Sequence, residues 1–120
     1  VQPGELAARG FEAWATSANI DGDQKSKIWT IQLATMRDAV RIRNEITQTK
    51  SAMFKELAKG NFNDKLIEGF KKKIVKLDQE RLSIMFAALD QVENALGKGP
   101  EAREYYRYLD EMELRRFQER

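Results

Sequence analysis

Histidine and cysteine are both absent from this chain of 120 residues. Their absence removes the commonest general base, the thiolate nucleophile and the usual ligands of zinc. Carboxylates remain at Asp78, Glu80, Asp90 and Glu93, but lysine and arginine are interleaved with them, which is typical of a solvated helix face. We therefore expect no enzyme activity, no cofactor and no metal site, with Zn²⁺, Ni²⁺ or Cu²⁺ binding no tighter than about millimolar.

Proline is scarce, since only Pro3 and Pro100 occur, and no apolar run approaches the roughly 20 residues that a membrane-spanning helix needs. Charged residues make up 33% of the chain and most of the rest are good helix formers, which favours long solvated helices over a sheet. The first residue is Val1 rather than Met, which suits a mature secreted protein and a trimmed chain equally. We expect no transmembrane segment in this chain, and a removed signal peptide or membrane anchor remains open.

Neither sign of charge dominates, because 21 Lys and Arg residues stand against 19 Asp and Glu residues. A nucleic-acid binder depends on a strong basic field, so nucleic acid is not an expected partner. The one basic run is Lys71, Lys72 and Lys73, which on a helix spreads over most of the circumference, as solvated charges do. Together with Arg43 and Lys50 it offers an alternative, a positive edge to an apolar groove that would attract acidic or unfolded partners.

Capping residues and glycines mark the ends of the first two expected helices. A short helical stretch from Glu5 to Ala15 has Leu6, Phe11 and Trp14 on roughly one side, and we interpret residues 1–20 as an N-terminal arm. The turn Asp21-Gly22-Asp23 then provides carboxylates that can cap a long helix. That helix runs without Gly or Pro to about Ala58, where Gly60 is a plausible C-terminal cap.

A second long helix is expected from about Asp64 to Leu96, with Gly69 weakening it locally by about 1 kcal/mol relative to Ala. Gly97 ends this helix, and Pro100 suits the first turn of a last helix that continues to near the C-terminus. Two long helices joined by a short turn must run antiparallel. The expected fold is therefore all-α: residues 21–120 form an elongated antiparallel hairpin of two long helices with a C-terminal third helix.

Each long helix has one apolar line along its full length, which predicts the seam between the two helices. In the first helix the line is Ile28, Ile31, Thr35, Ala39, Ile42, Ile46, Met53 and Leu57. In the second it is Leu66, Phe70, Ile74, Leu77, Ile84, Ala88 and Val92. We expect the helices to pack through Ile42, Ile46, Phe70, Ile74 and Leu77.

A second apolar stripe follows each long helix further round the cylinder, and one hairpin cannot bury both stripes. Leaving such side chains in water forgoes several kcal/mol, comparable with the net stability of a small domain. The stripe residues that we take as candidates for partner binding are Trp29, Leu33, Met36, Val40, Leu82 and Phe86, and Phe54, Val75 and Leu89 extend the two stripes. Trp29 and Leu33 are expected to be accessible, and Leu89 to be covered by the last helix.

Four covers for the second stripes remain open. They are the last helix with Tyr105, Tyr106, Leu109 and Met112, the N-terminal arm, a second copy of the chain, and a client protein. The first three would make the stripes permanent core, whereas the fourth would make them an open apolar groove.

The residues around the first capping turn resemble a family signature. The segment Ile20-Asp-Gly-Asp-Gln24 is similar to the Leu-Thr-x-x-Gln motif that opens the first long helix in the Spy and CpxP family of periplasmic stress proteins. Ile20 stands for the Leu as an apolar staple, Asp21 for the capping Thr, and Gln24 for the first-turn amide. A second signature before the last helix of that family is matched here by Pro100 and Glu101, without its Thr and Gln.

The resemblance covers residues 20–115 in helix order and lengths. It implies a periplasmic, bent antiparallel hairpin that dimerises into a cradle and acts as an ATP-independent chaperone or as the ligand-binding part of a sensor. Relatives that sense transition metals use His, which this chain lacks, so the chaperone or envelope-stress branch is the better match.

The sequence thus favours a periplasmic helical binding protein that holds protein clients, or a second copy as a homodimer, on an apolar and partly basic face. The alternatives are a structural helical dimerisation module and the sensor domain of a membrane-anchored signalling protein.

Overall fold

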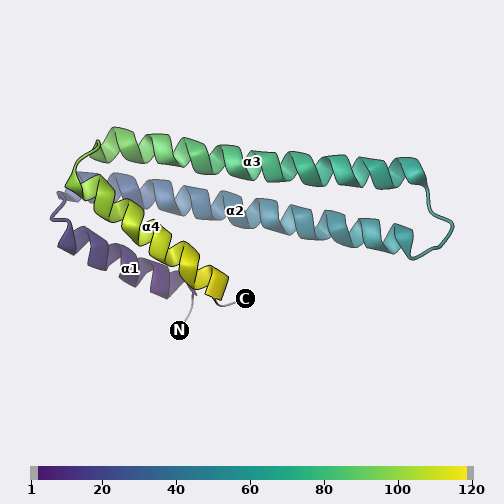
Figure 1. Ribbon diagram of the computed structural model, residues 1–120, viewed down its shortest axis with the longest axis horizontal. Helices are drawn as coiled ribbons and strands as arrows, with labels where there is room; N and C mark the ends of the chain where they lie inside the picture. The colour runs from purple at the N-terminus through teal and green to yellow at the C-terminus, as the bar shows by residue number, and fades with distance from the viewer. Residues whose placement is uncertain (1–2, 119–120) are drawn as a thin grey trace. The chain divides into compact units, whose positions relative to one another are not determined.

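The protein is all-α, as its sequence predicts. The computed structural model describes residues 3–118, and the side chains of residues 8–118. This part of the chain holds four helices and no strand: α1 (Pro3–Ser17), α2 (Gly22–Leu57), α3 (Asp64–Leu96) and α4 (Pro100–Gln118) (Figure 1). The bounds of the two long helices and of the last helix are as expected, while α1 is two residues longer at each end than expected. Leu6, expected on the apolar side of α1, has a side chain outside the described residues.

The chain divides into two compact units. The terminal unit comprises Val1–Ile31 and Leu89–Arg120, so it holds α1, α4 and the adjoining ends of the two long helices. The hairpin unit comprises Gln32–Ala88, the remainder of α2 and α3 with the turn between them. The expected division, an arm of residues 1–20 and a hairpin domain of residues 21–120, places the boundary elsewhere, because α1 contributes to the core of the terminal unit.

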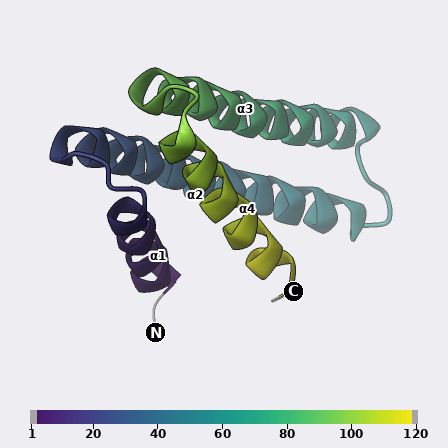
Figure 2. The same ribbon diagram turned by 60° about the vertical axis from the view of Figure 1, so that its left-hand side comes forward.

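In the hairpin unit, α2 and α3 run antiparallel and side by side, joined by the turn that follows Leu57 (Figures 1 and 2). Ile42 is fully buried and Leu77 is 6% exposed, whereas Ile46, Phe70 and Ile74 are half-buried. The residues expected to line this part of the seam therefore do so.

At the turn end of the hairpin the expected seam is wrong by one residue in each helix. Leu57 and Leu66 are 37% and 45% exposed, and their neighbours Glu56 and Ile67 are buried instead. The seam of α2 follows a seven-residue spacing from Ile42 through Thr49 to Glu56, and two of these positions are polar. A projection of apolar residues alone misses such positions.

The two polar seam residues are buried because their hydrogen-bonding groups are satisfied. Thr49 Oγ1 donates to the backbone oxygen of Glu45 at 2.7 Å. Glu56 accepts from the Lys59 ammonium at 2.7 Å and, through Oε1, from the backbone N–H of Asn63 at 3.2 Å. Glu56 therefore fastens the end of α2 to the residue before α3.

Glycines and capping side chains end the helices where the sequence predicts. Gly60 and Gly97 have φ angles of +78° and +72°, in the left-handed region that glycine adopts without strain. Asn63 Oδ1 accepts from the backbone N–H of Leu66 at 3.2 Å and so caps the start of α3.

The terminal unit has a core to which all four helices contribute. Its buried residues are Phe11, Trp14 and Ala15 of α1, Ile28 of α2, Val92 and Leu96 of α3, and Ala102 and Tyr105 of α4. Trp14 lies against Tyr105 with ring centroids 4.7 Å apart, and Phe11 lies against Trp29 at 4.9 Å. The stretch expected as an arm is thus a helix packed through aromatic contacts.

Two expectations about the second stripes fail in this unit. Trp29 is half-buried rather than accessible, because the Phe11 ring of α1 covers it. Leu89 remains 37% exposed rather than covered by α4, because Val92 and Leu96 take the core positions at this end of α3.

Candidate functional site

One side of the hairpin unit collects the apolar side chains that the seam does not use. The Arg41 guanidinium bonds Glu80 at 3.0 Å, so residue 41 of α2 is level with residue 80 of α3. Because the helices are antiparallel, Met36 is then level with Met85. On a seven-residue spacing, Met36 and Met85 flank the seam on the side opposite to Arg41 and Glu80. We call this side the open face; its apolar members are Leu33, Met36, Val40, Leu82, Met85 and Phe86.

The side chains of the open face differ widely in their exposure to solvent. Phe86, Val40 and Met85 are 56%, 45% and 39% exposed, whereas Leu33, Met36 and Leu82 are half-buried. The expectation that Leu33 is accessible is therefore wrong, as it is for Trp29. Exposed apolar side chains gathered on one side of a helical hairpin mark a candidate binding surface.

The sequence identifies most of this face. Five of the six candidate partner-binding residues lie on it, and the sixth, Trp29, belongs to the terminal unit. Sequence reasoning missed Met85, which falls between the two stripes in projection. Its position opposite Met36 emerges only from the register of the two helices, which the Arg41–Glu80 ion pair reveals.

The opposite edge of the hairpin is polar. Arg41 lies within ion-pair distance of Glu80, Glu45 and Asp38, at 3.0, 3.5 and 3.8 Å. The hydrogen bond that the Arg41 guanidinium donates to Glu80 is the main reason that the pKa of Arg41 lies above its ordinary value. This edge is therefore linked by ion pairs around Arg41. The open face carries the exposed apolar residues, and Asp78, seven residues before Met85, interrupts it with an ion pair to Arg81 at 3.0 Å.

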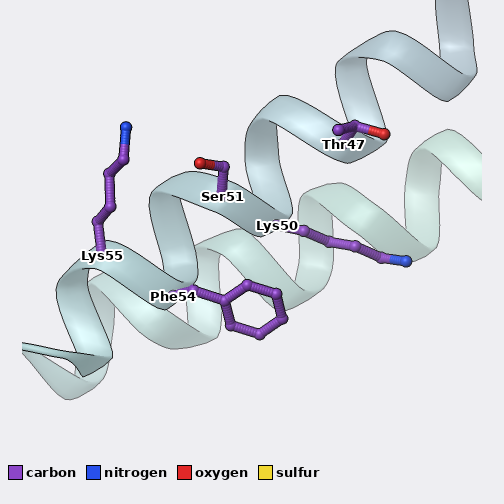
Figure 3. A pocket seen from close by; sticks show the side chains of 5 residues that line it. All are labelled: Thr47, Lys50, Ser51, Phe54 and Lys55. Atoms are coloured by element: carbon purple, nitrogen blue, oxygen red, sulfur yellow. The ribbon is translucent and has the colours of Figure 1, made fainter.

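Two shallow hollows on the hairpin unit each combine an exposed apolar side chain with lysines. The first is lined by Thr47, Lys50, Ser51, Phe54 and Lys55, and the second by Lys71, Lys72, Val75, Lys76 and Gln79. Figure 3 shows Lys50 and Phe54 leaving α2 on one side and Ser51 and Lys55 on the other. No carboxylate lines either hollow.

Charge is unevenly distributed along the chain. Nine Lys and Arg residues and four Asp and Glu residues fall between positions 43 and 76, a net charge of +5. Because the whole chain carries +2, the remaining residues carry −3. Glu56 and Glu68 are bound to Lys59 and Lys71, at 2.7 and 3.1 Å. The turn end of the hairpin is therefore a positive region despite the near-neutral total.

The motif residues at the start of α2 form the contacts that their types predict. Asp21 Oδ1 accepts from the backbone N–H of Gln24 at 2.7 Å, and Gln24 Oε1 accepts from that of Asp21 at 3.4 Å. This is a reciprocal capping box. Gln24 Nε2 also donates to the backbone oxygen of Ala95 at 3.4 Å, which ties the start of α2 to the end of α3, while Ile20 packs against the core.

The residues of the second motif, Pro100 and Glu101, stabilise the start of α4. Pro100 is the first residue of α4, where its missing N–H is not needed, and Glu101 lies in the first turn, where a carboxylate favours the helix dipole. Both residues belong to the terminal unit, whereas the open face is formed by residues of the hairpin unit.

Two further groups have pKa values that their surroundings shift. The hydrogen bond from Lys59, followed by that from the Asn63 N–H, holds the pKa of Glu56 below its ordinary value. Burial raises the pKa of the Tyr105 phenol. In the described residues, no three side chains among Asp, Glu, His and Cys are grouped to hold a metal ion. Every helix in residues 3–118 is too short or too polar to span a bilayer.

Comparison of the chain with known protein families, with curated proteins and with solved structures gave no match.

Proposed function

We propose that this protein is a binding protein that holds unfolded or partly folded protein segments on the open face of its hairpin unit. The observation that carries the proposal is the exposure of Val40, Met85 and Phe86 on one side of the hairpin, next to a region of net charge +5. Exposed apolar side chains bind apolar segments by removing them from water. The positive region attracts acidic clients from a distance and speeds their encounter.

Two methionines favour the interpretation that the open face adapts to different partners rather than fitting a single ligand. Met36 and Met85 are level with each other on the two helices, and methionine side chains are flexible and polarizable. Surfaces rich in methionine accept partners of different shape because their side chains repack. This property suits a chaperone, which must bind many sequences.

The proposal includes the chaperone-like or envelope-stress role and the periplasmic location that the family resemblance implies. The capping box between Asp21 and Gln24 supports the resemblance, because it preserves the physical role of the motif with different residues.

The proposal is tested by light scattering of a chemically denatured, acidic client that aggregates on dilution. The protein should suppress aggregation, and V40S with F86S should weaken this protection about tenfold, because both side chains would lose apolar contact with the client. The matched control is L114S with F117S, which changes two exposed apolar residues of α4. Equal protection by both variants would contradict the proposal.

A second copy of the chain is the other occupant that the open face can accept, and it would make the protein a structural dimerisation module. Sedimentation over a range of concentrations separates the two. The dimerisation module would replace the chaperone proposal if two results were found together. The parent protein would form a tight dimer that V40S with F86S converts to monomer, and the parent protein would give clients no protection.

A further inference from the structure

We propose that the turn end of the hairpin unit docks onto an anionic phospholipid surface. Four large apolar side chains, each in the turn or within a few residues of it, are exposed to solvent there. Phe54, Leu57, Phe62 and Leu66 are 59%, 37%, 39% and 45% exposed. We call this group the hairpin tip.

Lysines surround the hairpin tip. Lys55, Lys59 and Lys65 fall between Phe54 and Leu66, and the segment contains only two carboxylates, Glu56 and Asp64. Glu56 is buried and forms an ion pair with Lys59, so these two charges cancel and Lys55 and Lys65 supply the positive charge of the tip against Asp64. Clustered lysines next to apolar side chains favour anionic lipid, because the ammonium groups stay with the headgroups while the apolar groups enter the acyl boundary.

The tip residues emerge on both sides of the hairpin. Leu66 shares a side of α3 with Glu80, fourteen residues later, and Glu80 is on the polar edge with Arg41. Phe54 and Leu57 lie on the open-face side of α2, and Figure 3 shows the Phe54 ring extending away from its helix. A rigid protein surface would contact one side of the tip, whereas a fluid lipid layer can surround it. This arrangement favours lipid over an acidic protein as the occupant.

The depth of the tip also suits an interfacial position. Phe54 is three residues before the end of α2 and Leu66 is two residues after the start of α3. At about 1.5 Å per residue, both lie about 3 to 5 Å from the helix ends. Amphipathic elements bury their apolar groups about 5–10 Å into the headgroup and acyl boundary, so the tip can insert without burying the helices.

This inference does not depend on the proposed function, since it uses none of the open-face residues. Its consequence is a tethered binding protein: the hairpin tip holds the chain at a membrane surface while the open face remains available to clients.

The test is flotation of the full chain with vesicles of phosphatidylglycerol and phosphatidylcholine, compared with vesicles of phosphatidylcholine alone. The protein should float with the anionic vesicles only, and 0.5 M NaCl should release it. F54S with F62S should weaken binding at least about tenfold. V40S with F86S is the control and should leave vesicle binding unchanged.

A charge variant and a label complete the experiment. K55Q with K65Q should weaken binding roughly tenfold or more, while K27Q with K98Q, outside the positive region, should not. Because the chain has no cysteine, F62C can be labelled uniquely with a polarity-sensitive fluorophore, whose emission should shift to the blue on anionic vesicles. Circular dichroism establishes that each variant is folded.

Three results would overturn the inference: equal binding to phosphatidylcholine vesicles, undiminished binding by folded F54S with F62S, or no emission shift of the label at position 62. If poly-glutamate binds the tip and the anionic vesicles do not, the surface would instead be assigned to an acidic protein.

Discussion

At the scale of single residues, two glycines inside helices have opposite surroundings. A Cβ at Gly10 would lie 2.9 Å from Cε1 of Tyr108, whereas a Cβ at Gly69 would meet no atom within 4 Å. Gly10 therefore permits the close approach of α1 and α4, which the sequence reveals only as a weak point in a helix. Gly69 has no such role.

Alanine at the two glycines should separate these roles. G69A should raise the free energy of unfolding by about 1 kcal/mol, the helix-propensity gain of alanine over glycine. G10A should lose that gain and lower the melting temperature, because Tyr108 would have to move away from Tyr105, 5.7 Å distant between ring centroids. Thermal unfolding followed by circular dichroism measures both. A stabilising G10A would show that the contact with Tyr108 adjusts without cost.

The ionised form of Glu56 stabilises the folded chain. Its pKa is lowered in the folded chain, so it stabilises the fold above the ordinary glutamate pKa and ceases to do so as the pH falls through the lowered value. E56Q keeps an acceptor for the Asn63 N–H but removes the charge. We expect E56Q to be less stable than the parent at pH 7 and equally stable at strongly acidic pH. Urea titrations across this range test the prediction, and an equal loss at every pH would contradict it.

At the scale of helices, the seam and the exposed stripe differ in what they contribute to stability. Ile42 is fully buried in the seam, while Val75 on α3 is 57% exposed. I42A should lower the free energy of unfolding by about 2 to 5 kcal/mol through lost burial and a residual cavity. V75A should change it by less than about 0.5 kcal/mol. Urea denaturation gives both values; similar losses for the two variants would place Val75 in a core formed by self-association.

The polar seam positions belong to the same scale. Thr49 and Glu56 occupy core positions of α2 at the spacing that Ile42 sets, and each satisfies its own hydrogen bonds. Polar residues in the seam contribute less hydrophobic stabilisation than apolar ones would. Glu56 instead stabilises the turn by accepting a hydrogen bond from the backbone N–H of Asn63. The local conformation of the hairpin end therefore depends on hydrogen bonds as well as on apolar burial.

At the scale of the whole molecule, the two units use their apolar residues differently. Among the described side chains, the core of the terminal unit has eight buried residues from four helices, including Phe11, Trp14 and Tyr105. The hairpin unit has two helices and a single seam, so it cannot bury the second stripes by itself. Surface for binding is thus left on the hairpin unit, where the net positive charge is also concentrated.

The sequence alone determined the helices and much of the open face. Gly60, Gly97 and Pro100 fix helix ends through backbone restrictions that hold in any surroundings, and Asp21 with Gln24 forms a capping box through local contacts. The apolar periodicity of a helix is also local, so Leu33, Met36, Val40, Leu82 and Phe86 could be assigned to a second stripe away from the seam before any packing was known.

Only the tertiary structure decided how segments distant in sequence meet. The burial of Trp29 depends on Phe11, and the space at Gly10 depends on Tyr108, 98 positions away in the chain. The pairing of the two helices, which the Arg41–Glu80 ion pair marks, places Met85 opposite Met36. The same pairing buries Ile67 in place of Leu66 near the turn, where the Asn63 N–H bonds Glu56. These outcomes depend on distances between helices, which no periodicity within one helix contains.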